Sequence, residues 1–117
     1  MIHKNTRVVS ESGGDILRAT ILGEIDHHGA AGLRDELDEL ICASRPKKVE
    51  LDLSKVDFMD SSGLGIIMGR HATAEKIGAK LVLKNPAPRV ARIIELSGLN
   101  RMIPIEYQNG GGSDNEK

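Results

Sequence analysis

The fold of this chain is signalled most clearly at residues 58–70, which read FMDSSGLGIIMGR. A strand-like alternation of apolar and charged residues precedes this stretch, and a helical pattern follows it as far as Ile77. Asp60 is a residue type that caps helix N-termini, where its side chain accepts a hydrogen bond from the amide of Ser62 or Gly63. The sequence therefore predicts a helix over residues 60–77 that begins close behind a strand.

Working outward from this helix, strands and helices alternate, which is typical of an α/β domain with right-handed crossovers. Every second residue of the third and fourth predicted strands is charged, whereas strands covered on both sides are apolar on both faces. We therefore predict a two-layer α/β domain with helices on one face of the sheet and water on the other, which argues against a doubly wound nucleotide-binding fold. The predicted strands are residues 6–9, 16–25, 49–53, 80–84 and 102–105, and the predicted helices are residues 30–43, 60–77 and 88–96.

The composition excludes several classes of function. Sixteen Lys and Arg face 17 Asp and Glu, a net charge of −1, so no basic surface for nucleic acid or an anionic membrane is indicated. Phe58 and Tyr107 are the only aromatic residues, too few for a base-stacking platform. The single cysteine, Cys42, cannot form an internal disulfide, and we expect it to pack in the core beside Ile41.

Length and patterning predict one domain, over residues 1–108. Residues 109–117 read NGGGSDNEK and have nothing to bury, so we expect a disordered C-terminal tail. No signal peptide and no apolar run of about 20 residues is visible, which predicts a cytoplasmic protein.

The predicted helix over residues 60–77 contains three early glycines, Gly63, Gly65 and Gly69. Each costs about 1 kcal/mol relative to Ala in a helix interior, so a compensating role is expected. Counted at 3.6 residues per turn from Ser62, one face lacks bulk and forms a flat strip that another protein can approach closely. That face comprises Ser62, Gly65, Ile66, Gly69 and Thr73, whereas Leu64, Ile67 and Met68 are expected to face the sheet.

Three other interpretations of this segment remain open. A phosphate-binding loop would suit a strand followed by glycines and a helix, but the glycine spacing misses the dinucleotide fingerprint by one residue and no Walker lysine is present. A serine nucleophile could use Asp60 with His27 or His28, although the G-x-S-x-G pattern is absent. Alternatively, the segment is only a capped helix whose glycines pack on the sheet. The two adjacent histidines lack further metal ligands nearby, so no metal site is predicted.

Two motifs resemble one known family. Residues 60–65, DSSGLG, resemble the D-S-[ST]-G-[LV]-G signature of the STAS-domain anti-sigma-factor antagonists, and residues 23–28, GEIDHH, resemble their G-E-[LI]-D segment. The match runs in the same order from about Arg7 to Tyr107. The histidine doublet, the Phe-Met pair before Asp60 and the Gly-Arg pair at Gly69 are most similar to antagonists in a sporulation pathway, those of sigma F. An antagonist in a stress-response pathway is the nearer alternative, and a small nucleotide-binding domain the more distant one.

The resemblance implies a STAS fold with a mixed sheet and a regulatory rather than enzymatic role without a cofactor. It implies that the unphosphorylated protein binds an anti-sigma factor with serine kinase activity and thereby releases a sigma factor. It further implies that phosphorylation of Ser62 ends this binding and that a PP2C-type phosphatase restores it. The free protein is expected to be a monomer.

The resemblance also places a partner-binding surface around Ser62. Asp26 is expected beside the phosphorylation site, and Gly63 and Gly65 are expected to act through their backbone. His27 and His28, beside Asp26, are expected to cap the first predicted helix, over residues 30–43, and to edge this surface. A phosphate at a helix N-terminus is stabilised by free amides and the helix dipole, so phosphorylation should act at the surface without melting the helix. The expected contact residues are Asp26, His27, His28, Asp60, Ser61, Gly63, Gly65 and Gly69.

Overall fold

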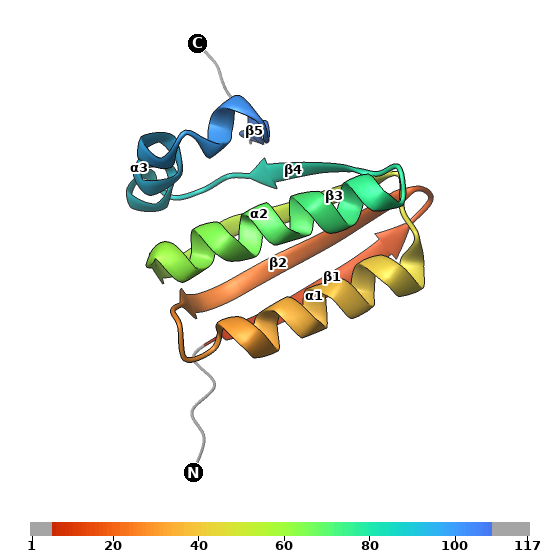
Figure 1. The fold of residues 1–117 in the computed structure, drawn as a ribbon, viewed down its shortest axis with the longest axis horizontal. Coiled ribbons are helices and arrows are strands. Elements are labelled where there is room, and N and C mark those ends of the chain that lie inside the picture. Colours follow the sequence, from red (N-terminus) through yellow and green to blue (C-terminus); the bar gives the residue numbers. More distant parts are fainter. Residues whose placement is uncertain (1–5, 109–117) are drawn as a thin grey trace.

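The computed structural model describes residues 6–108, and the predicted disordered tail lies outside these residues. Five strands and three α-helices alternate along the chain (Figure 1). In chain order they are β1 (Thr6–Gly13), β2 (Ile16–Ile25), α1 (Ala30–Ser44), β3 (Lys48–Met59), α2 (Ser61–Lys76), β4 (Lys80–Lys84), α3 (Pro88–Ser97), the short 3-10 helix η1 (Leu99–Arg101) and β5 (Ile105–Glu106).

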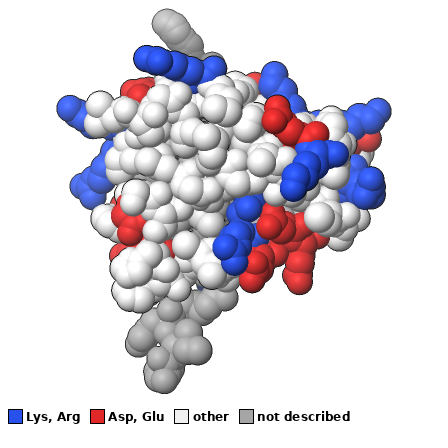
Figure 2. Space-filling model, in the orientation of Figure 1, with Lys and Arg blue, Asp and Glu red and all other residues white. Residues whose placement is uncertain are grey.

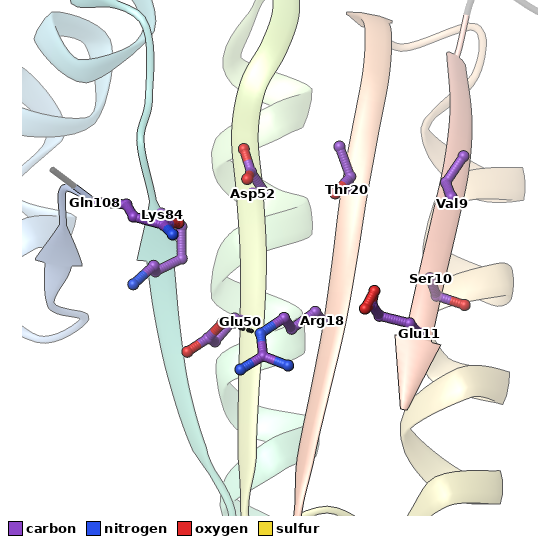
Figure 3. Close-up of a pocket in the computed structure, with 9 residues that line it drawn as sticks. All are labelled: Val9, Ser10, Glu11, Arg18, Thr20, Glu50, Asp52, Lys84 and Gln108. Carbon is purple, nitrogen blue, oxygen red and sulfur yellow. Dashed lines mark hydrogen bonds and ion pairs between the residues drawn. The ribbon is translucent and has the colours of Figure 1, made fainter. Parts of the chain in front are cut away.

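The strands form one mixed sheet in the order β1-β2-β3-β4-β5. β1 and β2 form an antiparallel hairpin, and the pairs β2–β3, β3–β4 and β4–β5 are parallel. Helices α1 and α2 contact each other and lie side by side over one face of the sheet (Figure 1). Seen from the opposite face, the strands lie in front and carry charged and polar side chains (Figure 3). The predicted two-layer α/β domain is confirmed.

The core lies between the sheet and the helices. Apolar residues alternate along β2 and β3 on the inner face, and α1 contributes three buried residues one helical turn apart. Burying a Leu or Ile side chain stabilises the fold by about 1.5–3 kcal/mol, so this layer supplies most of the driving force. The fully buried large side chains are Leu17, Ile21, Ile25, Leu37, Ile41, Leu51, Leu53, Ile67, Leu81, Leu83, Ile94 and Ile103.

The longest strand differs from its prediction. β3 continues six residues past Leu53, to Met59, and stays paired with β2 through two register shifts, one between Thr20 and Leu22 and one between Gly23 and Glu24. Such irregularities break the two-residue alternation while the strands stay paired. Val56 and Met59 therefore face the core three positions apart. The extra length carries Asp60 to the end of the sheet.

Two further predictions are corrected. Cys42 is exposed rather than packed in the core, because Ile41 occupies the buried face of α1 and the next residue lies about 100° around the helix. The outer face of the sheet is less exposed to solvent than expected, since Val82 is buried and Glu50 is only 8% exposed. Within residues 6–108 no helix is long and apolar enough to cross a membrane.

Candidate functional site

The sequence motifs meet at the carboxyl ends of two neighbouring parallel strands. Ile25 ends β2 opposite Met59, which ends β3, so Asp26 and Asp60 follow at the same edge of the sheet. The amide of Asp60 donates to the carbonyl of Ile25 at 3.1 Å, which ties the two chain segments together. The loop over residues 26–29 and the first turn of α2 are therefore neighbours. Carboxyl ends of strands in α/β sheets are where such folds place their functional sites.

Asp60 caps α2, as the sequence predicts. Its backbone is extended, with φ −103° and ψ −168°, and its Oδ1 accepts a hydrogen bond from the amide of Ser62 at 2.8 Å. The cap satisfies one of the free helix amides and places negative charge at the positive end of the helix dipole. A stable nucleotide phosphate is disfavoured here, because the carboxylate already occupies the position that an anion would take.

The Asp26 loop is held by its own hydrogen bonds. Oδ1 of Asp26 accepts from the amides of His28 at 3.0 Å and Gly29 at 3.2 Å, an arrangement that stabilises a tight turn. Helix α1 then begins at Ala30 without any side-chain cap. The prediction that the two histidines cap this helix is therefore wrong, because Asp26 organises the turn instead and leaves His27 and His28 exposed.

The exposed face of α2 begins at the two serines. Ser61 is exposed and Ser62 half-buried, both in the first turn of the helix. A Cβ added at Gly65 or Gly69 would meet no other part of the protein within 4 Å, so space is open beside the helix backbone at both positions. In Figure 2, which shows the helix side of the molecule, uncharged atoms cover the centre of the face and charged groups lie around them. We call the residues Ser61, Ser62, Gly65, Met68, Gly69 and Ala72 the α2 strip.

A family model for the STAS domain matches residues 7–109. The chain belongs to the STAS domain family. It is 34% identical over 105 residues to an anti-sigma F factor antagonist of Paenibacillus polymyxa, a match covering 90% of this chain and 89% of that protein. It is 35% identical over 104 residues to an anti-sigma-B factor antagonist of Bacillus subtilis (strain 168), covering 89% and 93%. The solved structure of the anti-sigma factor antagonist SpoIIAA in its unphosphorylated form aligns with a TM-score of 0.76 at 25% identity, covering 89% of this chain and 90% of that one.

The α2 strip of this STAS domain is rotated from the predicted face. Gly63 and Ile66 are buried, whereas Met68, expected toward the sheet, is 42% exposed. The exposed residues follow a line through Ser61, Gly65 and Met68. This line is turned about the helix axis by nearly 100°, about the angle between successive residues, from the predicted face centred on Ser62. Gly63 is therefore buried within the protein and is not available for contact with a partner.

The cause of the rotation is the close contact between α2 and the end of β3. An ideal Cβ built at Gly63 would lie 2.1 Å from Cγ and 2.6 Å from Sδ of Met59. The backbone of the first turn thus rests directly on a buried methionine, which turns Ile66 and Ile67 toward the core. For Gly63, the interpretation as a packing glycine is correct.

Sequence reasoning missed a buried charge on the same helix. Arg70 is 5% exposed, and its Nε lies 2.9 Å from Oδ1 of Asp38 on α1. The hydroxyl of Thr73 also reaches this carboxylate, at 3.3 Å. Burial lowers the pKa of the Arg70 guanidinium, and the charge of Asp38 opposes that shift. The pair fixes α2 against α1. Arg70 follows the buried Gly63, Ile66 and Ile67 at helical spacing, which is the only signal for its burial.

The histidines of the STAS domain lie beside the cap. Nδ1 of His27 is 4.0 Å from Oδ2 of Asp60, and its ring centroid is 4.1 Å from that of His28. Among the described residues, neither imidazole forms a hydrogen bond with the hydroxyl of Ser62, so the contact required of a nucleophile and its base is not formed. Among residues 6–108 no group of three or more potential metal ligands is found.

Proposed function

We propose that this STAS domain is an anti-sigma factor antagonist and that it binds an anti-sigma factor through the Asp26 loop and the α2 strip. The observation that carries the proposal is the meeting of these two segments at one end of the sheet, with two serine hydroxyls at the start of an accessible helix face. The class of function comes from its relatives, which are anti-sigma F and anti-sigma-B factor antagonists. A strip of small residues allows a partner to approach the helix backbone closely, and Met68 adds an adaptable apolar contact.

The proposed switch is phosphorylation of Ser62 by the anti-sigma factor, acting as a serine kinase. Ser62 is the second residue of α2, and its amide is bound by the side chain of Asp60 rather than within the helix. Adding a phosphate there breaks no hydrogen bond between helix residues. The phosphate brings about −1.5 to −2 charge to a surface that already carries the Asp60 carboxylate. A partner that fits the neutral strip is then repelled, and a PP2C-type phosphatase restores binding.

The kinase step is tested with matched serine variants. Wild type, Ser62→Ala and Ser61→Ala are incubated with the anti-sigma kinase and ATP, and the site is read by tandem mass spectrometry. Wild type and Ser61→Ala should each accept one phosphate, and Ser62→Ala none. A phosphate found on Ser61, or on the Ser62→Ala protein, contradicts the assignment.

The sigma pathway needs its own test. The histidine doublet and the Phe-Met and Gly-Arg pairs favour a sporulation sigma F pathway, which we propose. A stress-response pathway is the second candidate, because the identity to an anti-sigma-B factor antagonist, 35%, matches the 34% to an anti-sigma F factor antagonist. Titration against both anti-sigma factors decides between them. Binding to the anti-sigma-B factor that is about tenfold tighter than binding to the anti-sigma F factor, or 1.4 kcal/mol, would overturn the sporulation assignment.

A further inference from the structure

The first strand is a long, open sheet edge. β1 has eight residues and lies at one end of the strand order, whereas β5 at the other end has two. Within residues 6–108 no strand pairs with the outer side of β1. Such edges are normally blunted by charged side chains, above all lysine, or by proline or a bulge. β1 reads TRVVSESG, with no lysine or proline; its two charges, Arg7 and Glu11, are of opposite sign, and it pairs with β2 without a register shift. It is therefore competent to pair with another strand.

The hairpin determines which backbone groups face outward. Gly14 and Asp15 form a two-residue turn, with Gly14 at φ +59°, and Gly13 pairs with Ile16 on either side of it. The pair flanking such a turn is hydrogen-bonded, and bonded pairs alternate with non-bonded pairs along an antiparallel ladder. Arg7, Val9 and Glu11 accordingly bond to β2, and the amides and carbonyls that point to the open edge are those of Thr6, Val8, Ser10 and Ser12.

The outer face of β1 carries a symmetric pattern of side chains. Val9 and Glu11 lie on this face (Figure 3). Arg7 lies on it as well, because side chains alternate between the two faces along a strand. Val9 is 59% exposed, and Arg7 and Glu11 are exposed as well. Neither Arg7 nor Glu11 forms an ion pair with another described residue, and Arg18 beside Glu11 is engaged with Glu50 at 3.1 Å. The positive Arg7 and the negative Glu11 thus lie two residues to either side of the apolar Val9.

We propose that β1 pairs antiparallel with β1 of a second copy, about a two-fold axis at Val9, to form a homodimer with one continuous sheet. In this register Val9 faces its own copy, and Arg7 of each chain faces Glu11 of the other. Val8 faces Ser10, so the outward backbone groups of both residues exchange hydrogen bonds across the interface. The Val9 pair and the two Arg–Glu pairs fall at non-hydrogen-bonded positions, where Cα atoms approach to about 4.5 Å and side chains interact most strongly.

Other registers are less favourable. A shift of one residue places the outward side chains on opposite faces and misaligns the hydrogen-bonding groups. A shift of two removes both Arg–Glu pairs, and a shift of four brings Arg7 opposite Arg7 or Glu11 opposite Glu11. Parallel pairing in register also aligns like charges. The sequence of β1 therefore favours one self-complementary arrangement, in place of the monomer expected from sequence.

The dimer leaves the α2 strip free. β1 lies at the edge of the sheet, whereas Asp26 and Asp60 follow β2 and β3, and α1 lies over β1 and β2 with α2 beside it (Figure 1). Each copy would thus keep an accessible docking site. This inference is independent of which partner the site binds.

Sedimentation velocity of the full chain over a concentration series tests the proposal. The average mass should rise from the 12.6 kDa of one chain toward twice that value. Arg7→Glu alone and Glu11→Arg alone each place like charges opposite each other twice, and each should weaken association about tenfold. An equimolar mixture of the two variants restores both opposite-charge pairs in a heterodimer and should recover wild-type association.

Two further variants serve as controls. Arg89→Glu reverses an exposed charge on α3 and should leave association unchanged. Ser10→Pro removes an amide that points outward, so it should block pairing while the β1–β2 ladder is retained. The proposal is overturned if wild type remains at 12.6 kDa up to about 1 mM, a concentration that detects even weak self-association. It is equally overturned if Arg7→Glu and Glu11→Arg act no more strongly than Arg89→Glu, or if their mixture fails to associate.

Discussion

Two glycines in the first turns of α2 should respond in opposite directions to the same substitution. Gly63 and Gly65 are two residues apart, and Ala adds the same single methyl group at each. At Gly63 that methyl would lie 2.1 Å from Cγ of Met59, 2.6 Å from its Sδ and 3.3 Å from Cγ2 of Ile25. At Gly65 it would meet no atom within 4 Å. The structure therefore predicts strain at one position and none at the other.

The magnitudes follow from these contacts. Gly→Ala in a helix interior gains about 1 kcal/mol, so Gly65→Ala should raise the free energy of unfolding by about that amount. Gly63→Ala must displace Met59, which is 2% exposed and whose Cγ is too near the main chain to swing away. Overpacking of this kind costs about 1–3 kcal/mol. Because the gain in helix propensity offsets part of this cost, Gly63→Ala should lower the free energy of unfolding by about 1 kcal/mol. The two variants should then differ in stability by about 2 kcal/mol.

Urea unfolding of both variants and wild type measures the difference. The midpoints should move in opposite directions while the m-value stays constant, since the surface exposed on unfolding hardly changes. If Gly63→Ala proves as stable as Gly65→Ala, the first turn of α2 does not rest on Met59. The orientation assigned to the α2 strip would then be wrong.

Further predictions concern the cap, the strip, the switch and the buried charge. Asp60→Ala should lower stability by about 1 kcal/mol in thermal unfolding, with Asp60→Asn recovering most of the loss, and equal losses would mean that charge rather than the cap matters. Gly65→Leu should leave the protein at least as stable as wild type but weaken anti-sigma factor binding at least about tenfold by calorimetry; unchanged affinity would place the strip outside the interface. Phosphorylation of Ser62 should alter stability by no more than about 1 kcal/mol yet weaken binding at least about 100-fold, or 2.7 kcal/mol; a parallel loss of stability would indicate helix melting instead. Arg70→Ala should destabilise by about 2–3 kcal/mol in urea, because loss of the side chain of this 5% exposed residue leaves a gap between α2 and α1, whereas the carboxylate of Asp38 is 35% exposed and stays hydrated; Arg70→Ala combined with Asp38→Ala should cost less than the sum of the single changes.

The parts of the fold that were predictable rest on local chemistry. Asp60 was placed as an N-cap because its side chain and the following amides form a short-range unit that needs no tertiary information. Gly98, which follows the predicted helix over residues 88–96, adopts φ +86° just past α3 for an equally local reason, since glycine favours this backbone conformation at the end of a helix. The charged residues of β3 and β4 indicated one open face of the sheet. The family signature then brought Asp26 and Ser62 together, which spacing alone could not.

The parts that were missed depend on contacts between distant residues. The face of α2 was misjudged because Gly63 and Arg70 count as non-apolar in any periodicity, yet both are buried, one by Met59 and the other beside Asp38. The length of β3 was underestimated because its pairing with β2 is irregular, and only the partner strand reveals that it continues. Cys42 was assigned to the core from its neighbour, whereas the register of α1 on the sheet decides its exposure.

The three glycines of α2 now separate into two kinds. Packing on Met59 accounts for Gly63 within the isolated domain. Nothing in the fold requires Gly65 or Gly69, because neither has a positive φ and a Cβ at either position would meet open space. Together they give up about 2 kcal/mol of helix stability relative to Ala. In the proposed function, close approach of an anti-sigma factor to the helix backbone is the benefit that offsets this cost.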